Sequence, residues 1–213
     1  MSDNFLNKLK QTLKNCIAEV NSIRDIFCYH PGIDFTRERK ISFTDICNSL
    51  IQLQGKSMPC EILDLWGHDA AAPTPSAFIQ QRKKIMPDGF AFLFSHFSST
   101  TLPLQDKLYH GYRLIAVDGS DANIYRNPED EETFIHEGEK GYNAIHINAC
   151  YDLLNHTYTD VQFQGKKKLH ERDAFNRMVD RSHLDRVIYI ADRGYESFNT
   201  FAHCSKILKQ KIL

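Results

Sequence analysis

The sequence has 213 residues, of which 42% are hydrophobic and 25% charged, so it can bury a core and form one large domain or two small ones. Its net charge of −1 excludes a chain that is basic throughout, and any nucleic-acid-binding surface must therefore be local. The six cysteines have neither metal-ligand nor redox spacing, and no apolar run approaches the roughly 18 residues of a membrane span. Residues 1–10 are too polar for a secretion signal, so we expect a cytoplasmic protein with reduced thiols and no membrane contact.

The first half of the chain has the spacing of helices. Apolar residues recur every three or four positions in five stretches. These stretches are 5–20, 43–53, 59–66, 78–86 and 90–97. Pro31-Gly32 interrupts the pattern, Ser76 can cap the fourth helix, and residues 87–89 have the composition of a turn. The sequence predicts a helical domain over residues 1–105.

The pattern changes to that of strands near residue 110. Residues 113–117 and 187–191 are short apolar runs typical of buried strands. Between them, residues 145–151 and 157–163 alternate as in a hairpin, and residues 174–179 have helical spacing. A right-handed crossover would make the two buried strands parallel. A helix is expected over 198–208, residues 211–213 could begin a further strand, and the acidic segment 127–141 is expected to be an exposed loop.

Two aspartates follow the predicted buried strands. Asp118 comes after the first and Asp192 after the second, and ligands of open α/β sheets bind beyond the carboxyl ends of strands. Paired carboxylates suit hard divalent cations, and two such metals can serve phosphodiester chemistry. Arg193 could clamp a phosphate beside them. The alternative is that each aspartate only caps a helix or forms a turn.

Several motifs together resemble one family. Residues 115–121 and 190–197 resemble the first and second acidic motifs of the DDE transposases of bacterial insertion sequences, in the group typified by insertion sequence four. Residues 142–146 and 151–155 resemble its central hairpin, and residues 171–173 resemble the start of the following helix. Segments 34–37, 57–65 and 77–84 also fit its members.

The resemblance implies an α+β or α/β fold in which the helical region precedes a ribonuclease-H-like mixed sheet over residues 110–213. It implies a Mg²⁺- or Mn²⁺-dependent enzyme that nicks transposon ends and joins them to target DNA. Asp118 and Asp192 are then catalytic residues and metal ligands. The partners would be element-end and target DNA, and pairing of two ends allows a homodimer. The expected location is the nucleoid of a bacterial cell.

The sequence departs from the family in its third acid. That acid is a glutamate in a later motif of tyrosine, arginine, glutamate and lysine, which this sequence lacks. We therefore expect an incomplete catalytic domain and an inactive, truncated enzyme. Asp121, Asp160, Glu171 and Glu196 are available as replacements, but surface solvation is the simpler interpretation of each. The alternatives are a DNA-binding competitor that does not cut, or another ribonuclease-H-like nuclease such as a resolvase.

Local basic clusters could bind DNA despite the neutral total. The fourth predicted helix places a set of polar and basic residues on or near an exposed face, where they could contact bases and phosphates. This set is Gln80, Gln81, Arg82, Lys83 and Lys84. Lys166, Lys167 and Lys168 follow the hairpin and could contact a DNA backbone. Both clusters can equally be solvated surface, and His146 is interpreted as structural.

Overall fold

The computed structural model describes residues 3–37, 39–67 and 72–209. The chain divides into two compact units, Met1–Pro103 and Leu104–Leu213. Within the described ranges, no helix is both long enough and apolar enough to cross a membrane. All six cysteines are free thiols.

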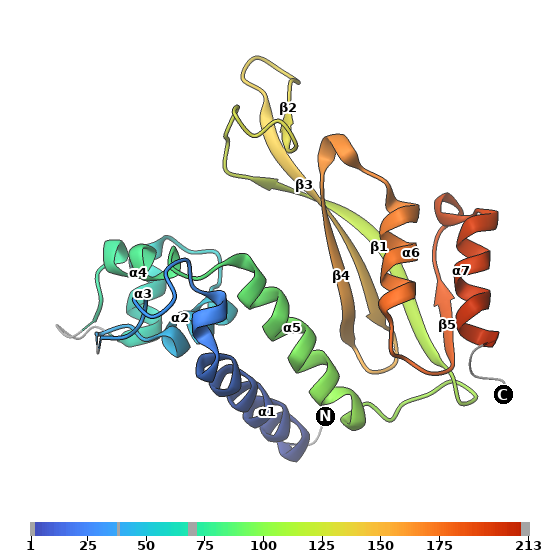
Figure 1. Cartoon of the computed structure of the whole chain (residues 1–213), viewed down its shortest axis with the longest axis horizontal. Helices are drawn as coiled ribbons and strands as arrows, with labels where there is room; N and C mark the ends of the chain where they lie inside the picture. Colours follow the sequence, from blue (N-terminus) through green and yellow to red (C-terminus); the bar gives the residue numbers. More distant parts are fainter. Residues whose placement is uncertain (1–2, 38, 68–71, 210–213) are drawn as a thin grey trace. The chain divides into compact units, whose positions relative to one another are not determined.

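The first unit is helical, as the apolar spacing predicts (Figure 1). Its elements are α1 (Asp3–Ser22), η1 (Arg24–Phe27), α2 (Phe43–Gln52), α3 (Met58–Trp66), α4 (Pro75–Arg82) and α5 (Pro87–Thr101), and η2 (Leu102–Leu104) spans the boundary between the two units. The long helices α1 and α5 pack against each other, and α2 contacts both α1 and α4. Ile17, Ile46 and Phe78 are fully buried between these helices, so their apolar faces form one core.

The boundaries around α4 differ from the prediction. Thr74, rather than Ser76, caps the helix, because its hydroxyl accepts a hydrogen bond from the backbone N–H of Ala77. The helix ends at Arg82, and Ile85 instead forms an isolated β-bridge with Cys28. Pro87 does not form a turn, because it occupies the first position of α5, where a missing N–H costs no hydrogen bond.

The second unit is built on one mixed sheet. Its strands are β1 (Arg113–Ile124), β2 (Phe134–Ile135), β3 (Tyr142–Asp152), β4 (Thr157–Gly165) and β5 (Val187–Ile190). β3 and β4 form the predicted antiparallel hairpin, and β1 pairs antiparallel with β3. β5 lies parallel to β1, so the predicted parallel pair is confirmed. The fold is α+β with a mixed sheet, as the ribonuclease-H-like resemblance implies.

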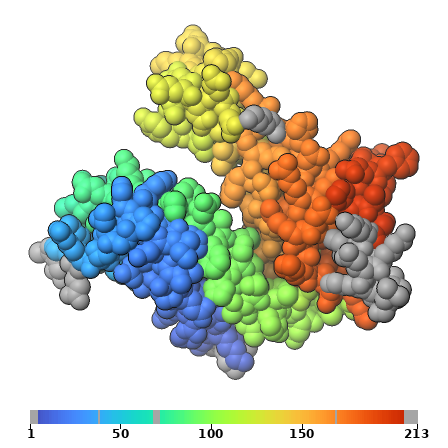
Figure 2. Space-filling view, in the orientation of Figure 1, coloured from blue at the N-terminus to red at the C-terminus, as the bar shows by residue number. Residues whose placement is uncertain are grey.

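Two helices cover one face of this sheet (Figure 1). They are α6 (Glu171–Arg181) and α7 (Phe198–Lys209), and the short helices η3 (Lys166–Lys168) and η4 (Arg193–Tyr195) precede them. Ile115 and Val117 of β1 pack against Phe175, Met178 and Val179 of α6. In Figure 2 the yellow segment around β2 projects beyond the helix-covered body of the same unit.

Three expectations about this unit are wrong. β1 continues past Asp118 to Ile124, because its polar second half pairs with β3 in unbroken register. The segment 127–141 is not simply an exposed loop, because β2 lies within it and Phe134 is buried. β5 is not a buried strand, because it pairs only with β1 in the described sheet and Ile190 is 44% exposed. The strand considered for residues 211–213 lies outside the described residues.

Candidate metal and DNA site

The parallel pairing of β1 and β5 brings the two predicted aspartates to one place. The pairing ends with Ala116 opposite Ile190. Asp118 and Asp192 each lie two residues further along the chain, so they occupy matching positions at the end of the paired segment. Both aspartates are exposed, and their carboxylates are open to ligands.

The two aspartates differ in local structure. Asp118 lies within β1, where its Oδ1 accepts a hydrogen bond from the N–H of Gly119 at 2.8 Å. Asp192 follows β5 and caps η4 by accepting from the N–H of Gly194 at 2.7 Å. A residue with a side chain would not fit at position 194 without a shift, because its Cβ would lie 2.8 Å from Asp192 Oδ1. Asp192 is therefore a helix cap, and its second oxygen can serve another ligand.

Tyr195 lies beneath this acidic edge. It is only 3% exposed, and its hydroxyl has no hydrogen-bond partner in the described structure. Burial raises the pKa of Tyr195, and the charges of Glu171, Asp118 and Asp192 raise it further. These three carboxylates therefore act together on one buried phenol, and this part of the unit is strongly acidic.

A chain of polar contacts supports β1 next to Asp118. His146 of β3 is buried, and its Nδ1 lies 2.7 Å from Asp121 Oδ1. Its Nε2 lies 3.2 Å from Glu171 Oε1, although the two atoms are not aligned as a hydrogen bond. Lys166 contacts the other oxygen of Asp121. The Lys166 hydrogen bond, and then that of His146, lower the pKa of Asp121.

Sequence reasoning treated His146 as structural and Glu171 as solvated, and it missed their contact. The contact between Asp121 and His146 follows from strand register, because the two residues lie directly opposite each other where β1 pairs with β3. The glycine between Asp118 and Ser120 has a related role. A Cβ at Gly119 would overlap His146 Nε2 and lie 3.1 Å from Glu171 Oε1. Gly119 thus allows the histidine to reach across β1.

A small cavity lies beside the acidic edge. Its volume is about 420 Å³, and its lining includes Glu171, Arg172 and Gly194. The guanidinium Nε of Arg172 donates to the carbonyl of Gly194 at 2.8 Å and thereby joins α6 to the turn that carries Asp192. The cavity therefore opens between the start of α6 and the candidate metal ligands.

The other predicted site residues of this unit are dispersed. Arg193 is exposed in η4, next to Asp192. Lys166 is committed to Asp121, whereas Lys167 is exposed. The side chain of Lys168 lies outside the described part of the structure.

The predicted basic face of α4 is only partly present. Arg82 and Lys83 are exposed. The expectation of an exposed Gln81 is wrong, because Gln81 is 8% exposed and lies one turn from the buried Phe78 on the same helix face. Lys84 pairs with Asp34, with 3.8 Å between Nζ and Oδ1.

The donor atoms at the acidic edge match the chemistry of a hard divalent cation. Asp118 and Asp192 supply carboxylate oxygens, which Mg²⁺ and Mn²⁺ prefer. Among the residues that the structure describes, no group of three or more His, Cys, Asp or Glu side chains is arranged to hold a metal ion. The fit therefore rests on two carboxylates.

Comparison with known proteins agrees with this geometry. Residues 109–210 match the family model of the transposase DDE domain. No curated protein and no solved structure matches the chain. The match begins just before β1 and includes both aspartates, the central hairpin, α6 and β5. The second unit of this chain is similar to the DDE domain of transposases.

Proposed function

We propose that this chain is a DNA transposase of the class that cleaves and transfers DNA strands at the ends of an insertion sequence, and that it is inactive by itself because its sequence lacks the family's third acid. The supporting observation is the matching position of Asp118 and Asp192 beyond the paired Ala116 and Ile190. The family match over residues 109–210 supports the same reaction class.

In this proposal Asp118 and Asp192 hold Mg²⁺ or Mn²⁺. When bound, such ions activate the attacking oxygen and stabilise the leaving oxygen of a phosphodiester. Arg193, exposed beside Asp192, binds the phosphate of the strand to be cut. His146, held by Asp121, fixes the backbone next to Asp118 and so positions the first carboxylate.

Metal binding tests these roles directly. We expect Mn²⁺ titrated into the full chain to bind, as followed by electron paramagnetic resonance, and we expect Asp118→Ala and Asp192→Ala each to weaken that binding by at least tenfold. Asp106→Ala is the matched control, because Asp106 is an exposed aspartate before β1. Equal Mn²⁺ affinity in all four proteins would overturn the assignment.

Strand cleavage is the second measurement. Labelled DNA carrying the element ends is incubated with each protein and Mn²⁺. We expect no cleavage by the unchanged chain, because the sequence lacks the family's third acid. Cutting by the unchanged chain and by Asp106→Ala, but not by Asp118→Ala or Asp192→Ala, would overturn the expected inactivity and support the roles of the two aspartates. Equal cutting by either of the latter two would contradict their catalytic role.

A second candidate function is DNA binding without cleavage, in competition with an intact transposase. A concave basic surface in the first unit favours it. In this case element-end DNA binds at low salt and is not cut with Mn²⁺. A band-shift experiment without any shift at low salt would exclude this candidate.

We also propose that the helical first unit binds DNA and that two chains pair on two ends. Gln81 and Arg82 at the end of α4, with Lys83 and Lys84 just after it, are the residues assigned to this role; Gln81 and Lys84 are the less exposed of the four. In the second unit, Lys167 and Lys168 are assigned to contacts with the DNA backbone, and Lys166 is assigned to the same role although its Nζ pairs with Asp121. Light scattering of the chain with and without element-end DNA tests the pairing. A complex whose mass corresponds to one chain bound to two DNA ends would contradict it.

A further inference from the structure

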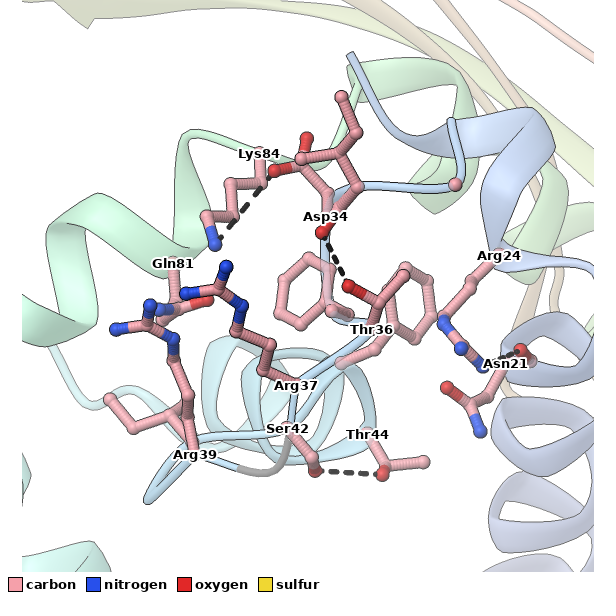
Figure 3. Close-up of a pocket in the computed structure, with 15 residues that line it drawn as sticks. Asn21, Arg24, Asp34, Thr36, Arg37, Arg39, Ser42, Thr44, Gln81 and Lys84 are labelled. Atoms are coloured by element: carbon pink, nitrogen blue, oxygen red, sulfur yellow. Dashed lines mark hydrogen bonds and ion pairs between the residues drawn. The ribbon is translucent and has the colours of Figure 1, made fainter. Parts of the chain in front are cut away.

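The first unit contains a large open cavity whose charge is unbalanced. Its volume is about 1040 Å³, and it lies between the end of α1, the loop residues 32–37 and 39–41, and the start of α2 (Figure 3). Among the residues that the structure describes, which leave out Glu38, four cationic side chains line it, against one acid, Asp34. The cations are Arg24, Arg37, Arg39 and Lys84. We call these four side chains and the cavity that they line the basic pocket.

The acid among the described residues of the basic pocket, Asp34, is already paired. Asp34 is 4% exposed, and its Oδ2 accepts a hydrogen bond from the backbone N–H of His30 at 3.1 Å. Its Oδ1 lies 3.8 Å from Lys84 Nζ. Asp34 and Lys84 therefore largely neutralise each other and form one wall. The positive charge that remains belongs to the three arginines.

The guanidinium groups of these three arginines have N–H donors that could bind an added anion. Arg24 donates from NH1 to the carbonyl of Asn21 at 3.3 Å, while its Nε is buried and has no hydrogen-bond partner among the described atoms. Within the described residues, no carboxylate forms an ion pair with Arg24, Arg37 or Arg39. Arg37 and Arg39 are exposed, and Figure 3 shows their guanidinium groups side by side near Gln81. A buried donor without an acceptor is unfavourable, so an anion in the basic pocket would satisfy Arg24 Nε, and it could also accept hydrogen bonds from the exposed guanidinium groups of Arg37 and Arg39.

Two packed aromatic rings and the capping box of α2 hold part of the lining of the basic pocket in place. Phe35 and Phe43 line it and pack edge to face, with ring centroids 5.5 Å apart. Lys84 Nζ lies 5.4 Å from the centroid of Phe35. The capping box of α2 fixes the lip, because Ser42 and Asp45 exchange hydrogen bonds. The carboxylate of Asp45 is committed to that exchange and does not line the cavity.

We propose that the basic pocket binds a backbone phosphate of DNA through Arg24, Arg37 and Arg39. Guanidinium forks match phosphate oxygens in pairs, and three of them around one cavity provide more donors than one phosphate needs. The choice of DNA rests on the proposed function. The inference moves the main DNA contact of the first unit away from α4, because Gln81 is buried and Lys84 is paired with Asp34.

The test measures DNA affinity without cleavage. The full chain is titrated with a labelled duplex in EDTA, with fluorescence anisotropy as the readout, over a series of salt concentrations. Arg37→Ala and Arg39→Ala each remove an exposed side chain and should leave the fold intact. Each is expected to lower affinity several-fold at low salt and to reduce the slope of log affinity against log salt by about 0.9. Lys14→Ala, an exposed change on α1, is the control and should leave both values unchanged.

Two further outcomes decide the proposal. Inorganic phosphate at millimolar concentration should weaken DNA binding by the unchanged chain more than chloride of equal ionic strength does. Equal affinity and equal salt slope for Arg37→Ala, Arg39→Ala and Lys14→Ala would overturn the proposal. This failure is distinguishable from failure of the proposed function, which would appear as Mn²⁺ binding or cleavage that is independent of Asp118 and Asp192.

Discussion

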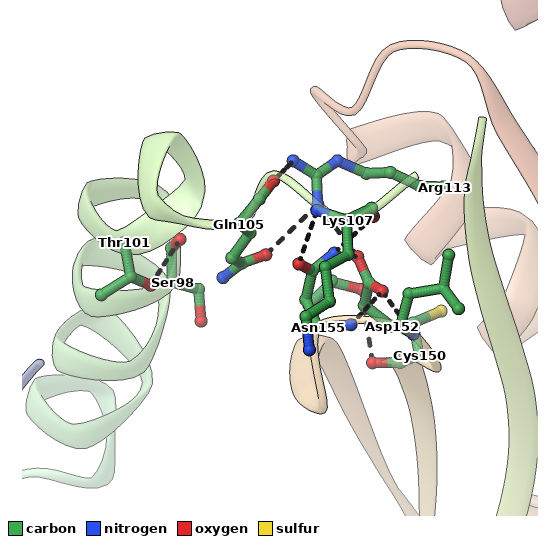
Figure 4. Close-up of polar contacts among 10 residues, drawn as sticks. Ser98, Thr101, Gln105, Lys107, Arg113, Cys150, Asp152 and Asn155 are labelled. Atoms are coloured by element: carbon green, nitrogen blue, oxygen red, sulfur yellow. Dashed lines mark hydrogen bonds and ion pairs between the residues drawn. The ribbon is translucent and has the colours of Figure 1, made fainter. Parts of the chain in front are cut away.

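Arg113 at the start of β1 forms an ion pair with Asp152 at the end of β3, with 2.9 Å between NH1 and Oδ2 (Figure 4). Asp152 is completely buried, and its Oδ1 also accepts from the backbone N–H groups of Leu154 and Asn155. Arg113 donates in addition to the carbonyl of Gln105 at 2.9 Å. This pair therefore fixes the hairpin turn, the first residues of β1 and the segment before it to one another.

The first prediction concerns removal of the cation from this pair. Arg113→Ala leaves a buried carboxylate without its partner, which should lower the free energy of unfolding of the second unit by about 3–5 kcal/mol. The measurement is amide hydrogen exchange of β1 and β3, which reports on this unit alone. Arg177→Ala on the exposed face of α6 is the control, with an expected change within about 0.5 kcal/mol. Equal protection in the two variants would show that Asp152 does not need Arg113.

The second prediction concerns the close approach at Gly119. A methyl group there would overlap the buried ring of His146 and lie 2.8 Å from its Cε1. Gly119→Ala should therefore destabilise the second unit by about 1–3 kcal/mol. Ser120→Ala, the neighbouring exposed position, should have a small effect.

A double-mutant cycle isolates this contact. In a His146→Ala background the two closest atoms beside residue 119 are removed and Glu171 Oε1 at 3.1 Å remains, so Gly119→Ala should cost less there than in the unchanged chain. Protection from hydrogen exchange in β1 is again the readout. The same cost in both backgrounds would mean that His146 is not the obstacle.

Much of the second unit is predictable from sequence because its apolar pattern is simple. The runs at 113–117 and 187–191 predict the parallel pair, and alternation predicts the β3–β4 hairpin. The extension of β1 to Ile124 is not predictable in this way. Residues 119–123 contain glycine, serine, aspartate and asparagine, which have low strand propensity, and only pairing with β3 keeps them extended.

The sequence predicts the positions of the two carboxylates of the candidate site, and it does not predict the contacts that surround them. Asp118 and Asp192 are recognisable because each follows an apolar run. The approach of Asp121 to His146, 25 residues away, depends on the β1–β3 register, which no local pattern sets. The burial of Gln81 had a local signal, because it lies three residues after the buried Phe78 on α4.

The third prediction concerns the pH dependence of stability. The hydrogen bond from Lys166, and then that of His146, lower the pKa of Asp121 in the folded chain. A lowered folded pKa means that this carboxylate stabilises the fold fully above its unfolded pKa of about 3.9 and loses the contribution as pH falls through the folded pKa. Asp121 is 45% exposed at the side chain, so the contribution is that of a screened surface pair.

Asp121→Asn tests this expectation. The stability difference between the unchanged chain and Asp121→Asn should be constant from about pH 5 to 7 and shrink below about pH 4. Urea denaturation at each pH, followed by far-ultraviolet circular dichroism, measures it. Asp106→Asn, with an exposed side chain, should show no such change. A difference that grows as the solution is acidified would contradict the assigned direction.

The fourth prediction concerns thiol reactivity. Burial raises the pKa of Cys47 and of Cys150 to about 12, and burial also raises the pKa of Cys16 and Cys28. Because the thiolate is the reactive form, iodoacetamide at pH 8 should modify these four very slowly in the folded chain. Cys60 is exposed and should be alkylated first. Peptide mapping by mass spectrometry over time gives the order of labelling, and 6 M guanidinium should make all six thiols react alike.

Cys60→Ser is the matched variant, and the first phase of labelling should disappear in it. Native-state labelling of Cys150 as fast as that of Cys60 would mean that the β-sheet core opens readily between β3 and α6, contrary to the packing of Cys150 against Met178.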